Sequence, residues 1–244
     1  MQDLKTRTIR EIALEAPLTT TIFEEYKIDY CCGGRKSFPE ACRSAGADPE
    51  VVMQKIDQLL TVAEESEPDW LKTASLGELI QYICDKHHLY TREEIASLTP
   101  LMAKVAGRHG ERHPELLELA RVFNDLCQDL SEHLLKEERI LFPYIEQLER
   151  SISNHAAVPV SCFGTVENPV RVMMTEHDTA GDFLREMRKI THQYLVPEGA
   201  CVSFSTLFRR LEALERDLHQ HIHLENNLLF PKAVELEARV FGRT

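Results

Sequence analysis

The sequence predicts an all-α protein with a small N-terminal helical domain, residues 1–62, followed by an antiparallel four-helix bundle, residues 70–240. After residue 70, apolar residues recur every three or four positions in four long stretches, as in amphipathic helices. No strand pattern separates these stretches, and part of the pattern repeats 88 residues later. Four long amphipathic helices without strands favour a four-helix bundle.

The small domain ends at an acidic stretch that runs from Ala63 to Asp69. The roughly 60 residues before this stretch are too few to bury a large core. A helix is predicted from Pro49 to about Leu60, with Asp48 as its N-cap. Two earlier groups of apolar residues have helical spacing, namely Ile9, Ile12, Ala13 and Ala16, and then Ile22, Phe23 and Tyr26.

The first hairpin of the bundle is predicted from its start and stop signals. Ser75 and Glu78 have the spacing of a capping box, and they open a helix that ends near Leu98 because Pro100 follows. His113-Pro114 opens the second helix. Its inward stripe is predicted to contain Leu116, Leu119, Phe123, Leu126, Leu130, His133, Glu137, Ile140 and Tyr144.

The second hairpin follows the same logic. Asn168-Pro169 opens the third helix, whose inward face carries Val170, Met173, His177, Leu184 and Met187. The fourth helix is predicted to begin near Ser203 or Ser205. Its stripe contains Leu207, Leu211, Leu214, Leu218, His221 and Glu225.

An internal repeat relates the two hairpins. His133-x3-Glu137 is followed by Leu-Phe-Pro at 141–143, and His221-x3-Glu225 is followed by Leu-Phe-Pro at 229–231. Every matched position is 88 residues apart. Each hairpin therefore has one inward His on its first helix and a His-x3-Glu pair on its second.

These polar residues occupy stripe positions where leucine is expected. Burying two ionised carboxylates without compensation costs several kcal/mol each, and a bound cation supplies that compensation. Periodicity slightly favours His87 over His88 as the ligand from the first helix, and either one completes a set of four His and two Glu. That set suits two non-haem iron ions with two bridging carboxylates and room for an oxo bridge, with manganese as the closest alternative.

Composition narrows the protein's class. A formal net charge of −12 argues against nonspecific binding to nucleic acid or anionic membranes. No apolar run is long enough to span a bilayer, and the charged N-terminal stretch lacks the pattern of a secretion signal. Seven scattered cysteines do not suggest a disulfide framework, so a cytoplasmic location is expected.

The adjacent Cys31 and Cys32 form a second candidate site. Neighbouring cysteines bridge only with strain, so a structural disulfide between them is not expected. Beside Gly33 and Gly34 they are candidates for iron-binding or redox-active thiols, whereas small residues in an ordinary turn are the alternative. Core packing is the default expectation for the other five cysteines, which are Cys42, Cys84, Cys127, Cys162 and Cys201.

Six motifs together carry a family resemblance. They are Ile28-Asp29-Tyr30-Cys31-Cys32-Gly33-Gly34, His87-His88-x3-Arg92-Glu93, His109-Gly110-x2-His113-Pro114, His133-x3-Glu137-x4-Phe142-Pro143, Glu176-His177-Asp178-x2-Gly181 and His221-x-His223-Leu224-Glu225-Asn226. With these motifs the bundle resembles the hemerythrin-like family. From about residue 4 to 235, the chain resembles the iron-sulfur cluster repair di-iron proteins (the RIC family).

The resemblance implies a di-iron centre with His88, His133, His177 and His221 as terminal ligands and Glu137 and Glu225 as bridges. It thus selects His88 over His87, and it gives His109 a supporting position near the centre, whereas His113 is expected to cap its helix and His223 to lie off the ligand face. Oxygen-carrying hemerythrins use a fifth His and an Asp in other spacings, which this sequence lacks.

For function, the resemblance implies repair of iron-sulfur clusters damaged by oxidative or nitrosative stress, by donation of iron with the help of Cys31 and Cys32. Damaged iron-sulfur proteins are the expected partners, and a homodimer is the expected assembly. The alternative is a di-iron enzyme or sensor that binds nitric oxide or oxygen, with reduction of nitric oxide as its reaction. Whether the protein is an enzyme stays open at this point.

Overall fold

The computed structural model describes residues 4–16, 19–30, 33–63, 73–153 and 159–242. It divides into two compact units, one of Met1–Ser75 with Ile222–Pro231 and the other of Leu76–His221 with Lys232–Thr244. The described residues are helical apart from turns, loops and one isolated bridge between Thr8 and Ser37. The all-α prediction is therefore confirmed. Within these residues, no helix is both long and apolar enough to cross a membrane.

Among the described residues, the N-terminal part contains a short 3-10 turn and four helices. These are η1 (Leu4–Thr6), α1 (Ile9–Glu15), α2 (Thr19–Glu25), α3 (Phe38–Ser44) and α4 (Pro49–Ala63). Its buried core includes Ile9, Ile12, Phe23, Phe38 and Ile56. α4 begins at Pro49 as predicted, and the Asp48 carboxylate accepts a hydrogen bond from the Glu50 amide at 2.9 Å. The periodicity does not predict α3, which is only seven residues long.

Gly33 lies in a turn that only glycine fits. A Cβ atom at this position would lie 2.8 Å from the backbone oxygen of Asp29, closer than real Cβ contacts come. The Gly33 amide also donates to the Asp29 carboxylate at 2.9 Å. The residues on either side of the cysteine pair are thus tied together, whereas Cys31 and Cys32 themselves lie outside the described residues.

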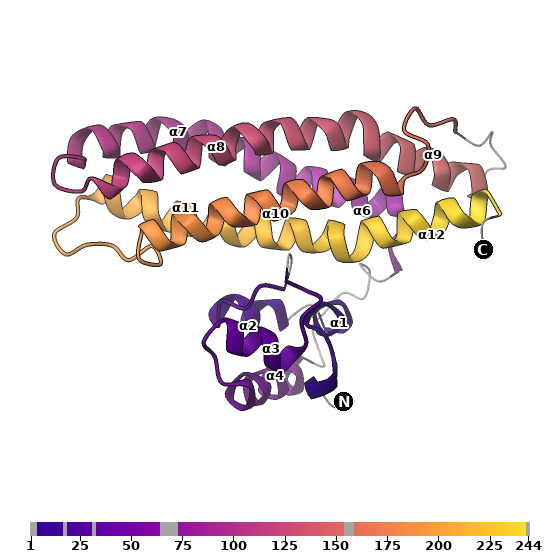
Figure 1. The fold of residues 1–244 in the computed structure, drawn as a ribbon, viewed down its shortest axis with the longest axis horizontal. Coiled ribbons are helices and arrows are strands. Elements are labelled where there is room, and N and C mark those ends of the chain that lie inside the picture. The colour runs from indigo at the N-terminus through magenta and orange to yellow at the C-terminus, as the bar shows by residue number, and fades with distance from the viewer. Residues whose placement is uncertain (1–3, 17–18, 31–32, 64–72, 154–158, 243–244) are drawn as a thin grey trace. The chain divides into compact units, whose positions relative to one another are not determined.

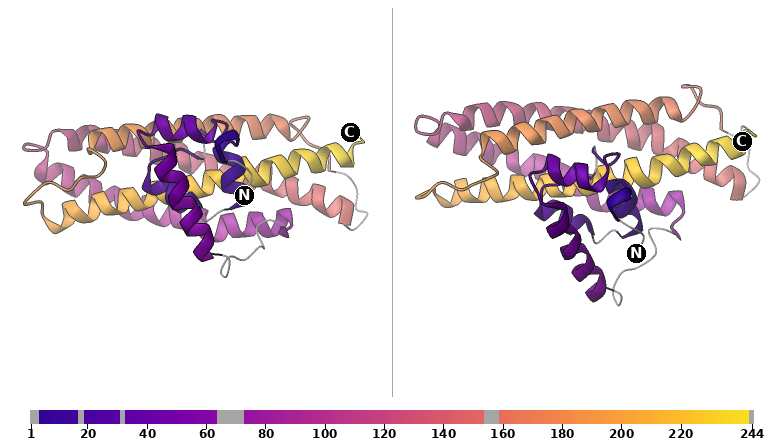
Figure 2. Two further views of the ribbon diagram at one scale, coloured as in Figure 1. Left: turned by 90° about the horizontal axis from the view of Figure 1, so that it is seen from below. Right: turned by 60° about the horizontal axis from the view of Figure 1, so that its bottom comes forward.

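Four helical runs form the bundle, and each is antiparallel to the next (Figures 1 and 2). The first run is α6 (Leu76–Tyr82), η2 (Ile83–His88) and α7 (Leu89–His109), and the second is α8 (Glu115–Lys136), η3 (Glu137–Leu141) and α9 (Phe142–Ser153). The third is α10 (Glu167–Ile190), and the fourth is α11 (Val202–Leu224), η4 (Glu225–Leu229) and α12 (Phe230–Val240). The segment Ile222–Pro231 belongs to this unbroken fourth run.

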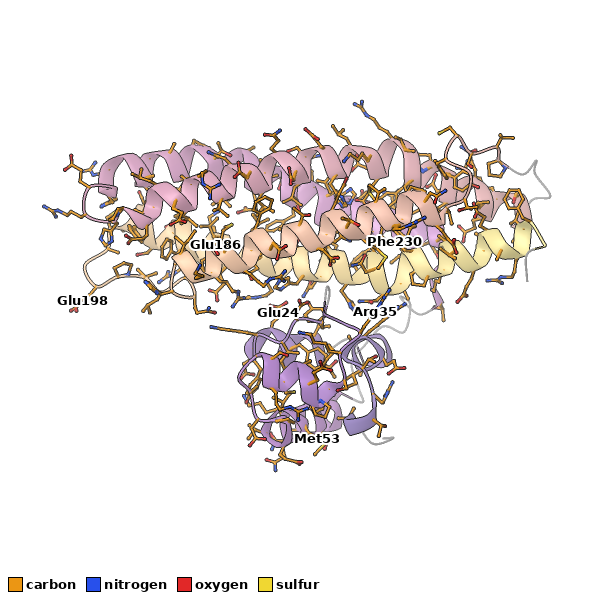
Figure 3. All side chains as sticks on the ribbon, in the orientation of Figure 1. Glu24, Arg35, Met53, Glu186, Glu198 and Phe230 are labelled. Carbon is orange, nitrogen blue, oxygen red and sulfur yellow. The ribbon has the colours of Figure 1, made fainter. Side chains whose placement is uncertain are left out.

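Side chains fill the space between these runs (Figure 3). The main apolar cluster joins all four runs and includes Leu98, Phe123, Leu184 and Leu211, each almost fully buried. Phe230, the first residue of α12, is also buried, while Glu198 projects from the loop before α11. The predicted stripes of the third and fourth helices are buried along their whole length, so these predictions are confirmed.

Three of the four runs contain a π-helical turn, and each turn begins or ends at a predicted metal ligand. η2 ends at His88, η3 begins at Glu137 and η4 begins at Glu225. A π-turn takes more residues per turn than an α-helix, so it rotates all later side chains. The prediction that Ile140 faces inward is consequently wrong: Ile140 is 49% exposed, whereas Leu141 is 1% exposed.

The predicted end of the first bundle helix near Leu98 is also wrong. α7 continues through Pro100 to His109. Proline has no amide hydrogen, so the carbonyl group four residues before Pro100 lacks its helical donor. Pro100 lies on the exposed side of α7, where water can hydrogen-bond this carbonyl instead. On the opposite side Leu98, Met102 and Val105 continue the buried stripe, and their burial stabilises the helix past the proline.

Two glutamates at matching positions hold the starts of the hairpins. Glu149 of α9 accepts hydrogen bonds from the amides of Leu76 and Gly77 at 2.7 and 2.9 Å, at the start of α6. Glu237 of α12 accepts one from the Val166 amide at 2.9 Å, at the start of α10. The two positions are 88 residues apart, so the repeat extends further than the ligand pattern indicates.

Candidate metal centre

The structure brings the six predicted ligands together in two overlapping groups. One group contains His88 and His221, and the other contains His133 and His177. Both groups also contain Glu137 and Glu225. Within each group, one ligand atom from every residue lies within 4.8 Å of the others. All six side chains are buried, and the two carboxylates are fully buried.

Within each pair, the two histidines face each other through their Nε2 atoms. His88 Nε2 lies 3.1 Å from His221 Nε2, and His177 Nε2 lies 3.0 Å from His133 Nε2. Oε2 of Glu137 lies 3.5 Å from Nε2 of His88 and 3.3 Å from Nε2 of His133. A single carboxylate thus reaches both pairs, which is the placement that a bridge between two ions requires.

His87 and His88 are both buried, but they have different neighbours. His87 shares a hydrogen bond with Asp217 through Nδ1 at 3.0 Å and stacks on the His221 ring, with ring centroids 5.9 Å apart. Only His88 belongs to a ligand group. The periodicity argument for His87 assumes a regular α-helix up to this point, and η2 breaks that assumption. The family resemblance selects the residue that the structure places with the other ligands.

Each half of the centre has an outer carboxylate that contacts the second nitrogen of one histidine. Glu138 lies 2.7 Å from His88 Nδ1 and accepts a hydrogen bond from Arg92 at 2.9 Å. Glu176 lies 2.9 Å from His133 Nδ1 and accepts one from Lys136 at 2.6 Å. Such contacts fix the ring orientation and direct Nε2 toward a metal ion. We refer to these as the Glu138 clamp and the Glu176 clamp.

The clamps shift the pKa of both carboxyl groups downward. The hydrogen bond from His133 is the largest cause at Glu176, and with the contribution of Lys136 it lowers this pKa to about 2. Burial would raise the pKa of Glu138, but hydrogen bonds from Arg92 and His88 outweigh it and lower this pKa. Both groups are therefore ionised at neutral pH and available as acceptors.

The donor set fits a transition-metal site. Four imidazole nitrogens and two carboxylates favour iron, manganese or zinc over the all-oxygen sites of calcium or magnesium. Two buried carboxylates in one small volume also require positive charge nearby. A bound cation would supply that charge, and Glu137 and Glu225 lie within reach of both histidine pairs.

Three further histidines that belong to the sequence motifs, His109, His113 and His223, lie outside the ligand groups. His223 hydrogen-bonds Asn227 at 2.8 Å, as expected for a residue off the ligand face, and burial lowers its pKa to about 4. His109 lies 3.2 Å from Cys201 Sγ, at the opposite end of α7 from His88. Twenty-one residues of helix place it about 30 Å from His88, so the expectation of a supporting position near the centre is wrong. His113 lies 2.9 Å from the Glu115 carboxylate. Pro114 holds the N-cap position of α8 and no side chain caps it, so the expectation that His113 caps this helix is wrong.

The isolated cysteines divide by exposure. Cys42 and Cys127 are buried, as expected, and burial raises their pKa values to about 11 and about 12. Cys84 is half-buried. Cys162 and Cys201 are exposed, so the expectation of core packing is wrong for these two. Both lie in or beside loops that flank α10, where the sequence offers no periodic pattern.

Comparison with known proteins agrees with this geometry. The hemerythrin HHE cation-binding domain matches residues 79–233, and a domain of unknown function called ScdA_N matches residues 5–60. The iron-sulfur cluster repair protein ScdA of Staphylococcus haemolyticus is 33% identical over 225 residues, covering 92% of this chain and 96% of that protein. The chain belongs to the ScdA/YtfE family.

Two further members of the ScdA/YtfE family support this. The iron-sulfur cluster repair protein YtfE of Yersinia pseudotuberculosis is 32% identical over 235 residues, covering 96% of this chain and 100% of that protein. YtfE of Citrobacter koseri is 34% identical over 224 residues, covering 92% of this chain and 94% of that protein. The family resemblance read from the motifs is thus confirmed, and the bundle is a cation-binding domain of the hemerythrin type.

Proposed function

We propose that this protein repairs damaged iron-sulfur clusters by donating iron from a di-iron centre in its bundle. The observation that carries the proposal is the sharing of Glu137 and Glu225 by two histidine pairs. In this assignment His88 and His221 would hold one ion and His133 and His177 the other, with Glu137 and Glu225 shared between them. The oxo bridge belongs to the oxidised, diferric form, so the form that donates iron is the reduced, diferrous one without that bridge. The names of the ScdA and YtfE relatives support the reaction class.

The bundle's own residues suit a donor of ferrous iron. Imidazole and carboxylate ligands hold ferrous iron less tightly than they hold most later first-row metals, so the ion can be released to a stronger acceptor. Thiolates and sulfides of a damaged cluster are such acceptors. We assign Cys31 and Cys32 as the thiols that receive the ion and pass it on, and residues 1–62 as the domain that carries them.

Metal content tests the centre itself. Mass spectrometry of the purified chain after anaerobic reconstitution is expected to give about two irons per chain, and His133→Ala is expected to lose them, because half of one histidine pair is removed. Zinc in their place, or no metal at all, contradicts the di-iron assignment.

Recovery of a damaged enzyme tests the repair function. Ferrous-loaded protein is incubated anaerobically with a hydratase whose cluster has been destroyed by oxidation or by nitric oxide. Activity is expected to return faster than with the same amount of free ferrous iron. The double variant Cys31→Ser/Cys32→Ser is expected to lose this advantage, while Cys162→Ser, which changes an exposed cysteine outside the pair, keeps it. Recovery of hydratase activity that is no faster than with free ferrous iron contradicts the proposal.

A second candidate function is the binding and reduction of nitric oxide at the same centre. It is favoured by a pocket of about 150 Å³ that reaches His133 and His177 and has room for a diatomic molecule. Steady consumption of nitric oxide with a reductant, unchanged in the Cys31→Ser/Cys32→Ser variant, selects this function over repair.

We further propose that the protein acts in the cytoplasm, on damaged iron-sulfur proteins there, and that it forms a homodimer. Sedimentation analysis of the purified protein tests the homodimer.

A further inference from the structure

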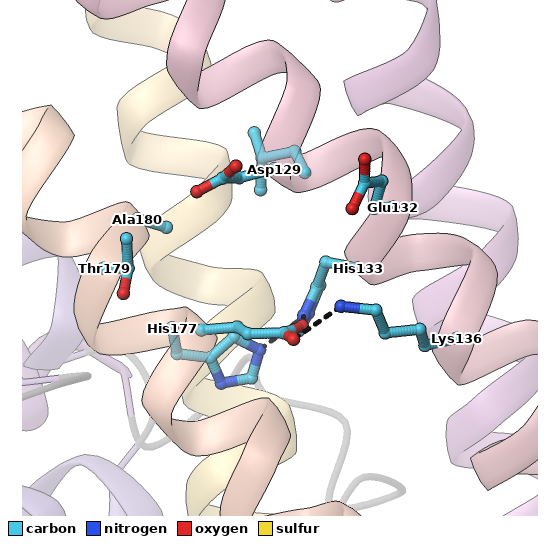
Figure 4. A pocket seen from close by; sticks show the side chains of 9 residues that line it. Asp129, Glu132, His133, Lys136, His177, Thr179 and Ala180 are labelled. Atoms are coloured by element: carbon cyan, nitrogen blue, oxygen red, sulfur yellow. Dashed lines mark hydrogen bonds and ion pairs between the residues drawn. The ribbon is translucent and has the colours of Figure 1, made fainter.

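A pocket lies beside the candidate metal centre, and its lining includes only one of the two histidine pairs, His133 and His177. It lies between α8 and α10 and is lined by Asp129, Leu130, Glu132, His133, Lys136, Glu176, His177, Thr179 and Ala180. Figure 4 shows Asp129 and Glu132 on one side, Thr179 and Ala180 on the other, and His133 and His177 together below the open space. The pocket thus leads to the pair His133 and His177.

The lining changes from exposed and charged to buried along the pocket. Asp129, Glu132 and Thr179 are exposed, whereas His133 and His177 are buried. Three carboxylates, from Asp129, Glu132 and Glu176, face one ammonium group, from Lys136. Confined negative charge of this kind raises the local concentration of cations. The lining therefore suits the passage of a hydrated divalent cation.

The other histidine pair is enclosed by rings. His88 is stacked against Phe142 with ring centroids 5.6 Å apart, and His221 is stacked against His87 with centroids 5.9 Å apart. His87 is itself held by Asp217. An ion that leaves the pair His88 and His221 past these rings requires the stacked side chains to move, which is a slower event than exchange into an existing pocket.

We infer that the two ions of the centre are not equivalent: the ion held by His133 and His177 is the exchangeable one, and it leaves and enters through the pocket between α8 and α10. This inference rests on the proposed iron-donor function. The step involves no electron transfer. The ferrous ion exchanges its bonds to the two imidazole nitrogens for water and for carboxylate oxygens of the pocket, and the bridging carboxylates stay with the ion between His88 and His221.

Chelation kinetics test the inference without a damaged cluster. Ferrous-loaded protein is mixed anaerobically with a coloured ferrous chelator, and release is followed by absorbance after total iron has been measured. The expected course has two phases, with about one iron per chain in the fast phase. Release in a single phase overturns the inference.

A matched pair of threonines tests the route. Thr179 and Thr175 are both exposed on α10, and both hydroxyls donate to a carbonyl four residues earlier, but only Thr179 lines the pocket. Thr179→Leu is expected to slow the fast phase about five- to tenfold by narrowing the pocket, while Thr175→Leu leaves it unchanged and both keep the same iron content. Equal rates in the two variants overturn the route.

Substitutions in the two clamps test which histidine pair holds the exchangeable ion. Glu176→Gln weakens support of His133 and is expected to speed the fast phase several-fold, whereas Glu138→Gln weakens support of His88 and changes the slow phase alone. The reverse pattern assigns the exchangeable ion to the other pair and overturns the inference. Normal two-phase release without recovery of hydratase activity instead refutes the repair function and leaves the inequality of the ions intact.

Discussion

The two hairpins of the bundle, Leu76–Ser153 and Glu167–Val240, present the same donors on different backbones. In the first hairpin both runs contain a π-turn, at η2 and η3, and each turn adjoins a ligand. In the second hairpin α10 is a regular α-helix around His177, and only the fourth run has a π-turn, at η4. His177, in a regular helix, and Glu137 and Glu225, at the first residues of their π-turns, lie where the periodicity places them. Residues within or after a π-turn, such as His88 and Ile140, are displaced by about one residue.

The bridging carboxylates offer the largest expected effect. Glu137 and Glu225 come from different hairpins but belong to both ligand groups, so either substitution removes a donor from both groups. Glu137→Gln and Glu225→Gln are each expected to lose most of the bound iron, measured by mass spectrometry. The metal-free protein should be no less stable to denaturant, because a buried charge is removed. Loss of only one ion in either variant would show that its carboxylate is not shared.

Substitutions after η3 sharpen the comparison of backbones. Leu141→Ala is expected to lower the free energy of unfolding by about 2–5 kcal/mol, and Ile140→Ala by less than about 0.5 kcal/mol, because only Leu141 is buried. Chemical denaturation of the two variants measures the difference. A regular α-helix through Glu137–Leu141 predicts the opposite order, so a larger cost at Ile140 would disprove the π-turn.

The matching glutamates at the hairpin starts should differ in strength. Glu237 is buried and accepts hydrogen bonds from both Val166 and Tyr144, whereas Glu149 is partly exposed. Glu237→Gln is expected to cost about 2 kcal/mol of unfolding free energy and Glu149→Gln about 1 kcal/mol. Equal costs, measured by denaturation, would mean that burial adds nothing to this interaction.

The pH dependence of the metal-free protein gives the smallest expected effect. The pKa of Glu176 is about 2 in the folded protein and near its ordinary value of 4.5 when unfolded, so this carboxylate contributes stability above pH 4.5 that is lost as pH falls toward 2. Between about pH 5 and pH 3 the wild type should lose about 1 kcal/mol more than Glu176→Gln, after allowance for solvent screening. Parallel curves for the two proteins would contradict the Glu176 clamp.

Much of the fold and most of the candidate ligands can be predicted from the sequence. The stripes of the third and fourth helices, the start of α4 at Pro49 and the repeated His-x3-Glu pair follow from local rules of periodicity and capping, which depend on near neighbours in the chain. Two carboxylates and four histidines at stripe positions indicate a bound cation through their chemistry alone. Family membership, carried by the same motifs, is confirmed by comparison with ScdA and YtfE.

Tertiary structure decided what those local rules cannot express. The inward position of His88, the exposure of Ile140 and the passage of α7 through Pro100 all depend on packing energy that outweighs regular helical geometry. The clamps join His88 to Glu138 and His133 to Glu176 across 50 and 43 residues of sequence, and the pocket joins α8 to α10. Residue types and spacing determined the candidate ligands, and contacts between distant helices decided how each candidate is oriented and which histidine pair lines the pocket.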